Sequence, residues 1–206
     1  MPIFTKDDTN FLFIHIPKTG GTSMEKIFFQ SGWTVSLTDY GGKGSLNHLR
    51  HCSPQHMHNV LLQSLFKLDE FDEIFMIVRN PYDRFVSEYC WVNQRDFNSP
   101  YPIESWATEA FAAYSQDNFI LDNHLRPQVE FRLPNTTVYK LEQGFETIIQ
   151  DLENRHQLKL SYDGVKVYSR DKISGYSPDK ATLNQSTKEL IYRQYSEDFR
   201  CFDYEA

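Results

Sequence analysis

The chain has 206 residues and a net charge of −7 at pH 7, and 40% of its residues are hydrophobic while 24% are charged. This composition is typical of a soluble globular protein, and the length predicts one domain over residues 1–206. The negative charge argues against a broad nucleic-acid-binding surface, and neither a membrane-spanning segment nor a signal peptide is recognisable, so we expect a cytoplasmic protein.

The first half of the chain shows one pattern twice: an apolar run typical of a strand buried on both faces, a tight turn, then apolar residues at helical spacing. These elements are expected as strand, helix, strand and helix at 11–16, 22–30, 73–79 and 82–92. Thr22 or Ser23 is expected near the N-cap of the first helix, and Asn80-Pro81 separates the second strand from its helix.

The second half continues with a third strand and its helix, and with a closing helix near the end of the chain. These three are expected at 137–141, 145–155 and 187–195, with a further helix at 118–130 that Pro127 interrupts, and with loops at 41–44 and 161–177. Strands that alternate with helices across tight turns imply a parallel sheet with right-handed crossovers. The pattern therefore predicts an α/β fold.

The turn PKTGGTS at 17–23 carries the residue types of a phosphate-binding loop. It lies between a strand and a helix, where backbone N–H groups and the positive end of the helix dipole converge on an anion. Gly20 and Gly21 would let the backbone approach a ligand, and Lys18 adds a full charge. The order is not that of a Walker A loop, because the lysine precedes the glycines. A plain tight turn with an incidental lysine is the alternative for this stretch alone.

Two stretches resemble the sulfotransferases that use PAPS (3′-phosphoadenosine 5′-phosphosulfate) as donor. FIHIPKTGGTS at 13–23 is similar to their 5′-phosphosulfate loop, and IVRNPYDRFVSEY at 77–89 is similar to their 3′-phosphate motif. VYKLEQ at 138–143 and YSEDFRCFDY at 195–204 extend the resemblance to the carbohydrate branch, family 2, which includes heparan and chondroitin sulfotransferases and bacterial relatives. Together with the local pattern, the resemblance implies a P-loop-NTPase-like three-layer domain with a central parallel sheet and the donor across the carboxyl ends of its strands.

The resemblance also implies which residues bind the donor. Lys18 matches the lysine that contacts the sulfate and the leaving phosphate. The remaining loop residues would surround the 5′-phosphate: Pro17, Thr19, Gly20, Gly21, Thr22 and Ser23. Arg79 and Ser87 match the pair that binds the 3′-phosphate, a role that suits a guanidinium because it can fork onto two oxygens. Arg84 is either a further phosphate contact or, as we favour, a surface arginine.

Sulfuryl transfer is an in-line displacement in which Lys18 would neutralise charge on the bridging oxygen while a base takes the proton of the acceptor. The resemblance points to His51 as that base, with His48 as an alternative, and to His124 in the stretch NHLRPQ (123–128) on the acceptor side. His15, inside the first strand, is interpreted as a structural or pocket-wall residue and not as a base. The histidine-rich stretch lacks a second ligand cluster, so we expect no metal.

The sequence leaves the acceptor and two rival functions open. Few basic residues are available for a long sulfated polymer, which favours a small molecule or an oligosaccharide whose carbohydrate-like hydroxyl is sulfated, with PAP as the second product. A catalytically inactive PAP- or PAPS-binding protein is the alternative, and a P-loop nucleotide kinase is a more distant one. Trp33, Tyr82 and Tyr176 either line the adenine or acceptor pocket or serve in plain packing.

Overall fold

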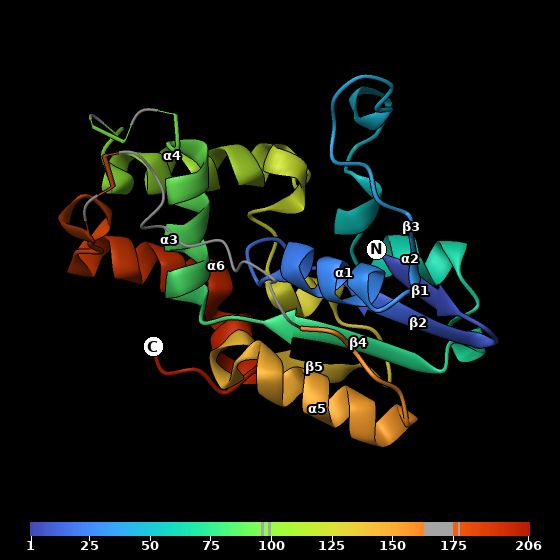
Figure 1. Ribbon diagram of the computed structural model, residues 1–206. Coiled ribbons are helices and arrows are strands. Elements are labelled where there is room, and N and C mark those ends of the chain that lie inside the picture. Colours follow the sequence, from blue (N-terminus) through green and yellow to red (C-terminus); the bar gives the residue numbers. More distant parts are fainter. Residues whose placement is uncertain (96, 99, 163–174, 177) are drawn as a thin grey trace. The chain divides into compact units, whose positions relative to one another are not determined.

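The computed structural model describes residues 1–95, 97–98, 100–162, 175–176 and 178–206, and the chain divides into two compact units (Figure 1). Among the described residues, the first unit combines 1–78 with 130–162, and the second combines 79–129 with 175–206. Of the loop predicted at 161–177, residues 163–174 and 177 lie outside the described part of the chain.

The first unit is built on a five-stranded mixed sheet with the strand order β3-β1-β2-β4-β5. The strands are β1 (Ile3–Lys6), β2 (Thr9–Ile14), β3 (Thr34–Ser36), β4 (Glu73–Val78) and β5 (Thr137–Lys140). β2, β4 and β5 run parallel to one another, whereas β1 runs antiparallel to both β2 and β3. The predicted parallel sheet is therefore confirmed for three strands, and the antiparallel edge is a feature that the sequence analysis missed.

The antiparallel edge arises from a hairpin at the start of the chain. Lys6 pairs with Thr9 across a two-residue turn, in which Asp7 takes a left-handed φ of 50°. A short aspartate side chain tolerates this region better than most. β1 has one fully buried side chain, Phe4, so its apolar signal is too weak to predict a strand.

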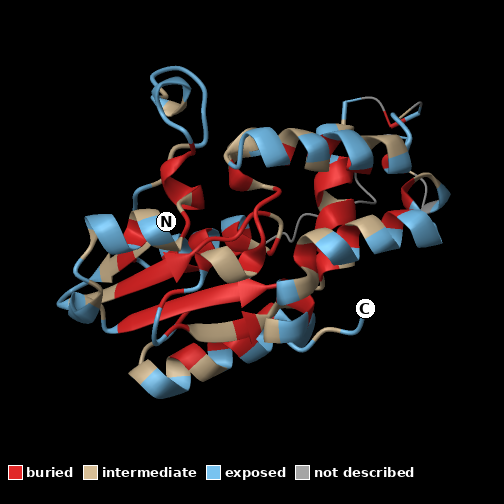
Figure 2. Cartoon of the chain, turned by 180° about the vertical axis from the view of Figure 1, so that it is seen from behind, coloured by how far each residue is buried: buried red, intermediate tan, exposed pale blue. Residues whose placement is uncertain are grey.

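The core of the first unit lies on one face of the sheet, under α1 (Gly21–Gln30) and α5 (Phe145–His156). Alternate strand residues supply aromatic rings to it, and the rings of Phe4 and Phe28 stack with their centroids 4.0 Å apart. The intervening side chains, such as Leu12 and Met76, are also fully buried, and Figure 2 shows β2 and β4 as buried throughout much of their length. Burial on both faces explains why these strands lack polar alternation. The short α2 (Asn59–Leu65) completes the helices of this unit.

The second unit packs α3 (Pro81–Val92) and α4 (Ile103–Gln116) against α6 (Gln185–Cys201). Its core is again aromatic, with the rings of Phe85 and Trp106 4.9 Å apart. α3 and α6 confirm predicted helices, although α6 extends beyond the predicted range at both ends. α4 was not predicted because two of its four buried residues are alanines, which give a weak periodic signal.

The helix predicted at 118–130 is wrong. The chain forms two short 3₁₀ turns there, Ile120–Asn123 and Gln128–Phe131. Leu121, Asp122 and Asn123 have positive φ angles of 52°, 58° and 64°, which a right-handed helix cannot accommodate. The segment is instead held by side chains of the second unit, described below.

Candidate functional site

The loop between β2 and α1 turns the chain sharply through two left-handed residues. Lys18 has a φ of 69° and Gly20 a φ of 89°, while the hydroxyl of buried Thr19 donates a hydrogen bond of 2.9 Å to the carbonyl oxygen of Ile16. A non-glycine residue in this region costs about 1–3 kcal/mol and persists only where the surrounding structure fixes it. Such strain is often found at functional sites, and the role of Lys18 stays a prediction.

The two glycines of the loop are required by packing as well as by backbone angles. A Cβ atom at Gly20 would lie 2.7 Å from the ring of Phe145, and one at Gly21 would lie 2.1 Å from the ring of His15. Both contacts are far closer than atoms tolerate. The sequence predicted that these glycines allow a ligand to approach the backbone. The packing of Phe145 and His15 already requires glycine at both positions.

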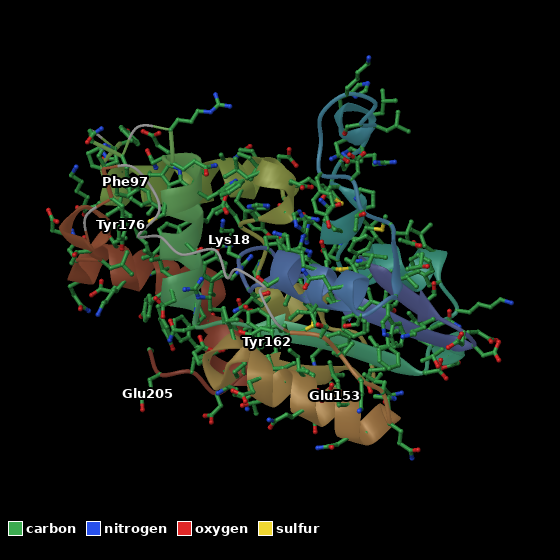
Figure 3. The ribbon with its side chains drawn as sticks, in the orientation of Figure 1. Lys18, Phe97, Glu153, Tyr162, Tyr176 and Glu205 are labelled. Atoms are coloured by element: carbon green, nitrogen blue, oxygen red, sulfur yellow. The ribbon has the colours of Figure 1, made fainter. Side chains whose placement is uncertain are left out.

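α1 begins with Gly20 as its N-cap, without a side-chain cap and without an acidic residue in its first turn. Thr22 and Ser23 lie near the N-cap as expected, within the first turn of the helix, but the N-cap itself is Gly20 and no side chain caps the helix. The first N–H groups of a helix lack intrahelical acceptors and form the positive end of its dipole, so an anion would stabilise them. Figure 3 labels Lys18 close to this end of α1.

A buried carboxylate supports the loop from inside the first unit. Glu25 of α1, which is 3% exposed, bonds His15 Nδ1 through Oε1 at 2.5 Å and accepts a hydrogen bond from the Tyr40 hydroxyl through Oε2. Burial, followed by the hydrogen bond to Glu25, raises the pKa of Tyr40, so the phenol remains protonated and donates. His15 is thereby fixed against Gly21, which confirms its structural interpretation.

The histidine-rich stretch separates into exposed and buried members. His51 and His48, the predicted base and its alternative, are both exposed. His56 is buried, its Nδ1 lies 3.1 Å from Ser53 Oγ, and its ring meets that of His15 edge-on with centroids 4.9 Å apart. Within the first unit, His56 is therefore the histidine of this stretch that contacts His15, whose ring packs against Gly21 of the loop. His56 was not among the predicted site residues.

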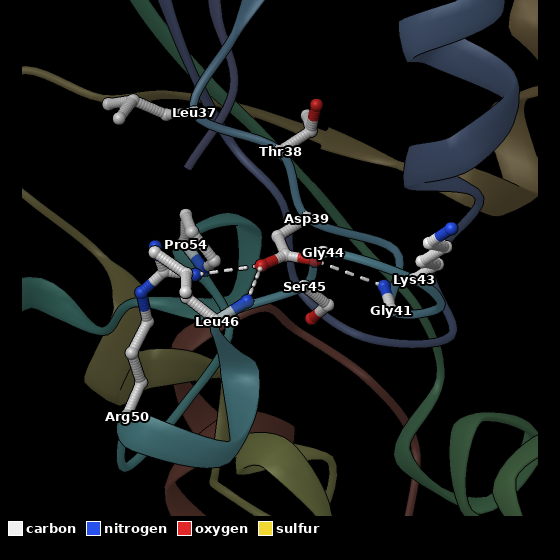
Figure 4. Close-up of a pocket in the computed structure, with 10 residues that line it drawn as sticks. All are labelled: Leu37, Thr38, Asp39, Gly41, Lys43, Gly44, Ser45, Leu46, Arg50 and Pro54. Carbon is white, nitrogen blue, oxygen red and sulfur yellow. Dashed lines mark hydrogen bonds and ion pairs between the residues drawn. The ribbon is translucent and has the colours of Figure 1, made fainter.

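Between β3 and His51 the chain forms an arm closed by Asp39, whose carboxylate accepts hydrogen bonds from the backbone N–H groups of Gly41 and Leu46 and from the Arg50 guanidinium (Figure 4). A hydrogen bond from Ser45, and these donors after it, lower the pKa of Asp39. A hollow of about 440 Å³ lies at this arm. Its lining consists of Leu37, Thr38, Asp39, Gly41, Lys43, Gly44, Ser45, Leu46 and Arg50, together with Pro54, which follows the arm in the chain. The loop predicted at 41–44 lies within this arm.

The carboxyl ends of β2 and β4 are neighbours on one edge of the sheet, because the strands are parallel and Ile14 pairs with Met76. The 17–23 loop follows the first of these ends, and Arg79 directly follows the second. In open α/β sheets this edge is where ligands bind.

The turn after β4 is organised by hydrogen bonds of the second unit. The Asn80 side chain caps α3 by accepting from the backbone N–H groups of Tyr82 and Asp83 at 2.9 and 3.4 Å. Arg79 is half-buried, and its backbone bonds the side chain of Gln128. Ser87, the second residue predicted to bind the 3′-phosphate, lies half-buried in α3.

His124, the second predicted base, is held by a buried carboxylate. Its Nδ1 lies 2.6 Å from Oε2 of Glu88, which is 3% exposed, and its carbonyl oxygen accepts a hydrogen bond of 2.7 Å from Arg84. Arg84 is itself 2% exposed and lies over the ring of Tyr195. The interpretation of Arg84 as a surface residue is therefore wrong, because its guanidinium supports the segment that carries His124.

In a comparison with known families, a model described as the sulfotransferase family matches residues 1–205. The chain belongs to the sulfotransferase family. Searches of curated proteins and of solved structures each gave no significant match. The match covers all but the last residue of the chain. The turns after β2 and after β4 in this sulfotransferase therefore both lie inside the matched region.

The three aromatic residues considered for the adenine or acceptor pocket of the sulfotransferase all make packing contacts. Trp33 is buried in the core of the first unit, Tyr82 lies 4.9 Å from the Phe199 ring, and Tyr176 lies 5.4 Å from the Phe97 ring (Figure 3). Among the described residues, no helix is both long and apolar enough to cross a membrane.

Proposed function

We propose that this sulfotransferase moves a sulfuryl group from PAPS to a hydroxyl of a carbohydrate-like acceptor and releases PAP. The observation that carries the proposal is the beginning of α1, which has no side-chain cap and follows a loop that holds Lys18 in a strained conformation. A phosphosulfate is the kind of anion that such an end attracts. Membership of the sulfotransferase family supports the chemistry.

In this proposal the donor contacts both turns. The 5′-phosphosulfate is bound by the Pro17–Ser23 loop, with Lys18 on the oxygen that bridges phosphorus and sulfur. The 3′-phosphate is bound by Arg79 and Ser87. Because the Asn80 side chain already satisfies the first N–H groups of α3, the positive charge at the second turn has to come from the Arg79 side chain.

The reaction breaks the bond between sulfur and the bridging oxygen and forms a bond between sulfur and the acceptor oxygen. Lys18 stabilises the negative charge that develops on the leaving phosphate, which is the usual electrostatic contribution of a positioned cation. The acceptor hydroxyl gives its proton to a base as it attacks. The proposal includes no metal.

His124 is the stronger of the two predicted bases. Its Nδ1 is bonded to the buried Glu88, which fixes the ring and stabilises the imidazolium that forms when Nε2 takes a proton. His51 is exposed, so water competes for its ring nitrogens. The structure adds His56 as a third candidate, because it is buried against His15.

The donor assignment is tested by calorimetry with PAP, ATP and NAD, each with and without Mg²⁺. We expect PAP to bind tightly without metal and to lose most of its affinity in Lys18→Ala and Arg79→Ala, while ATP and NAD bind weakly. Binding of ATP that depends on Mg²⁺ would support the kinase alternative instead.

Transfer of labelled sulfate from PAPS to a panel of sugars, phenols and amines tests the rest. We expect product only with carbohydrate-like hydroxyls. Product only with phenols or amines would contradict the acceptor class, and tight PAP binding without any product would support the inactive alternative.

A further inference from the structure

Gln128 bonds both polar groups of the Arg79 backbone. Its side-chain Oε1 accepts from the Arg79 N–H at 2.9 Å, and its Nε2 donates to the Arg79 carbonyl oxygen at 2.8 Å. Gln128 is fully buried, so these two hydrogen bonds form away from water, where breaking them leaves unsatisfied polar groups. The amide thus reproduces the pairing of a neighbouring strand at the residue that follows β4.

Gln128 is in turn held by Asp198 of α6, which is also fully buried. The backbone N–H groups of Gln128 and Val129 donate to the two carboxylate oxygens of Asp198, each at 2.8 Å. One carboxylate therefore fixes the backbone that carries the amide, and the amide fixes Arg79. All of these residues belong to the second unit.

Asn80 fixes the chain on the other side of Arg79. Its side chain caps α3, so the residue after Arg79 is anchored in addition to the Arg79 backbone, while the Arg79 residue is only half-buried. A long side chain that starts from a fixed backbone loses less entropy when it binds a phosphate. Residues that bind ligands need such support to hold a productive geometry.

We propose that Gln128, held by Asp198, is a positioning residue that sets the Arg79 guanidinium for the 3′-phosphate of the donor. The inference rests on the proposed function. It assigns specificity for a 3′-phosphorylated nucleotide to Gln128, which lies 49 positions after Arg79 in the chain. Gln128 belongs to the stretch at 123–128 that was predicted to lie on the acceptor side, and its contacts give it a different role.

The test compares adenosine 3′,5′-bisphosphate (PAP) with adenosine 5′-monophosphate, because the two nucleotides differ only in the 3′-phosphate. Their affinities are measured by calorimetry on the whole chain in the wild type and in Gln128→Met, which has a similar volume but no amide. We expect the ratio of the affinities for PAP and the monophosphate to fall by about tenfold or more. A misplaced Arg79 guanidinium would lose its hydrogen bond to the charged 3′-phosphate, and such bonds have this magnitude. The affinity for the monophosphate should stay unchanged.

Tyr195→Phe is the matched control. It removes a buried hydrogen bond of 2.9 Å to the carbonyl oxygen of Leu125, in the same segment as Gln128, but it does not touch Arg79. We expect it to lower the melting temperature while the preference for PAP stays at the wild-type value. Gln128→Asn, which keeps an amide but cannot reach both Arg79 groups, is the second variant if Gln128→Met does not fold.

The outcomes separate the inference from the function on which it rests. A wild-type protein that binds both nucleotides equally contradicts the PAPS assignment and the inference with it. A wild-type preference that survives in the Gln128 variant overturns the inference alone. An equal loss of affinity for both nucleotides also overturns it, because that is the result of a purely structural role.

Discussion

The turns that follow β2 and β4 both lead into a helix, but they treat the first N–H groups of that helix differently. In α3 the Asn80 side chain accepts hydrogen bonds from two of them, whereas α1 starts from Gly20 without a side-chain cap. In the first turn the Ser23 N–H donates to the Gly20 carbonyl oxygen, so an external anion would meet the N–H groups that precede it, whereas the second turn satisfies its donors with a side chain. A ligand at the second turn must therefore be recognised by a side chain, and Arg79 is the residue at that position.

The two turns also differ in what supports them. The first is supported by packing, since the His15 ring lies against Gly21 and the Phe145 ring lies against Gly20. The second is supported by hydrogen bonds from Gln128 to the backbone of Arg79. Substitutions of the two glycines at the first turn should thus act through steric contact, and substitutions around Arg79 at the second turn through the loss of specific polar partners.

The largest effect is expected from Lys18→Met, which removes the charge that we propose stabilises the leaving group. The rate of transfer from PAPS should fall by about 10²–10³-fold, as it does when a preorganised electrostatic contact is lost. Steady-state kinetics with a labelled donor measure this. Lys26→Met changes an exposed lysine of α1, the helix that follows the loop, and should retain wild-type activity. If the Lys18→Met enzyme retains wild-type activity, the proposal that the turn after β2 binds the anionic donor through Lys18 is wrong.

Gly21→Ala should have the next largest effect, because its new Cβ would lie 2.1 Å from a His15 ring that Glu25 holds in place. We expect a loss of about 1–3 kcal/mol in the free energy of unfolding, the usual cost of overpacking, together with weaker PAP binding. Urea denaturation and calorimetry measure the two effects. Thr22→Ala, at the next and exposed position, should change stability little. Equal stability of the two variants would disprove the packing requirement.

Asn80→Ala should have the smallest effect of the three. It removes the cap of α3 and should cost about 1 kcal/mol in the free energy of unfolding, measured by urea denaturation. Asn154→Ala, at an exposed position inside α5, provides the control and should be close to neutral. If Asn80→Ala is equally neutral, the contrast between a capped and an uncapped helix has no energetic basis.

Elements with a strong local signal could be predicted from the sequence. FLFI and IFMIV are continuous apolar runs, and each lies in a strand buried on both faces. The pairing of β1 with β2 was missed because it depends on the hairpin at Asp7, and α4 was missed because its buried face is rich in alanine.

The candidate site divides in the same way. Lys18 could be proposed from its residue type and its position after an apolar run, and Arg79 from the resemblance of residues 77–89 to a 3′-phosphate motif. Gln128 and Glu88 could not, because the partners of their side chains lie 49 and 36 positions away. Glu25 also escaped prediction, since a carboxylate in a helix usually faces water, and here it is buried between His15 and Tyr40.

The β1–β2 hairpin has a consequence for the order in which the chain folds. Its strands are joined by a two-residue turn, so closing it costs little loop entropy, whereas β4 reaches β2 only after the whole segment from His15 to Asp72 has been arranged. A hairpin forms within microseconds, well before long-range parallel pairs. We therefore expect Thr9–Ile14 to act as the template on which β4 and then β5 assemble. The strand that leads into the Pro17–Ser23 loop would then be among the earliest ordered parts of the chain.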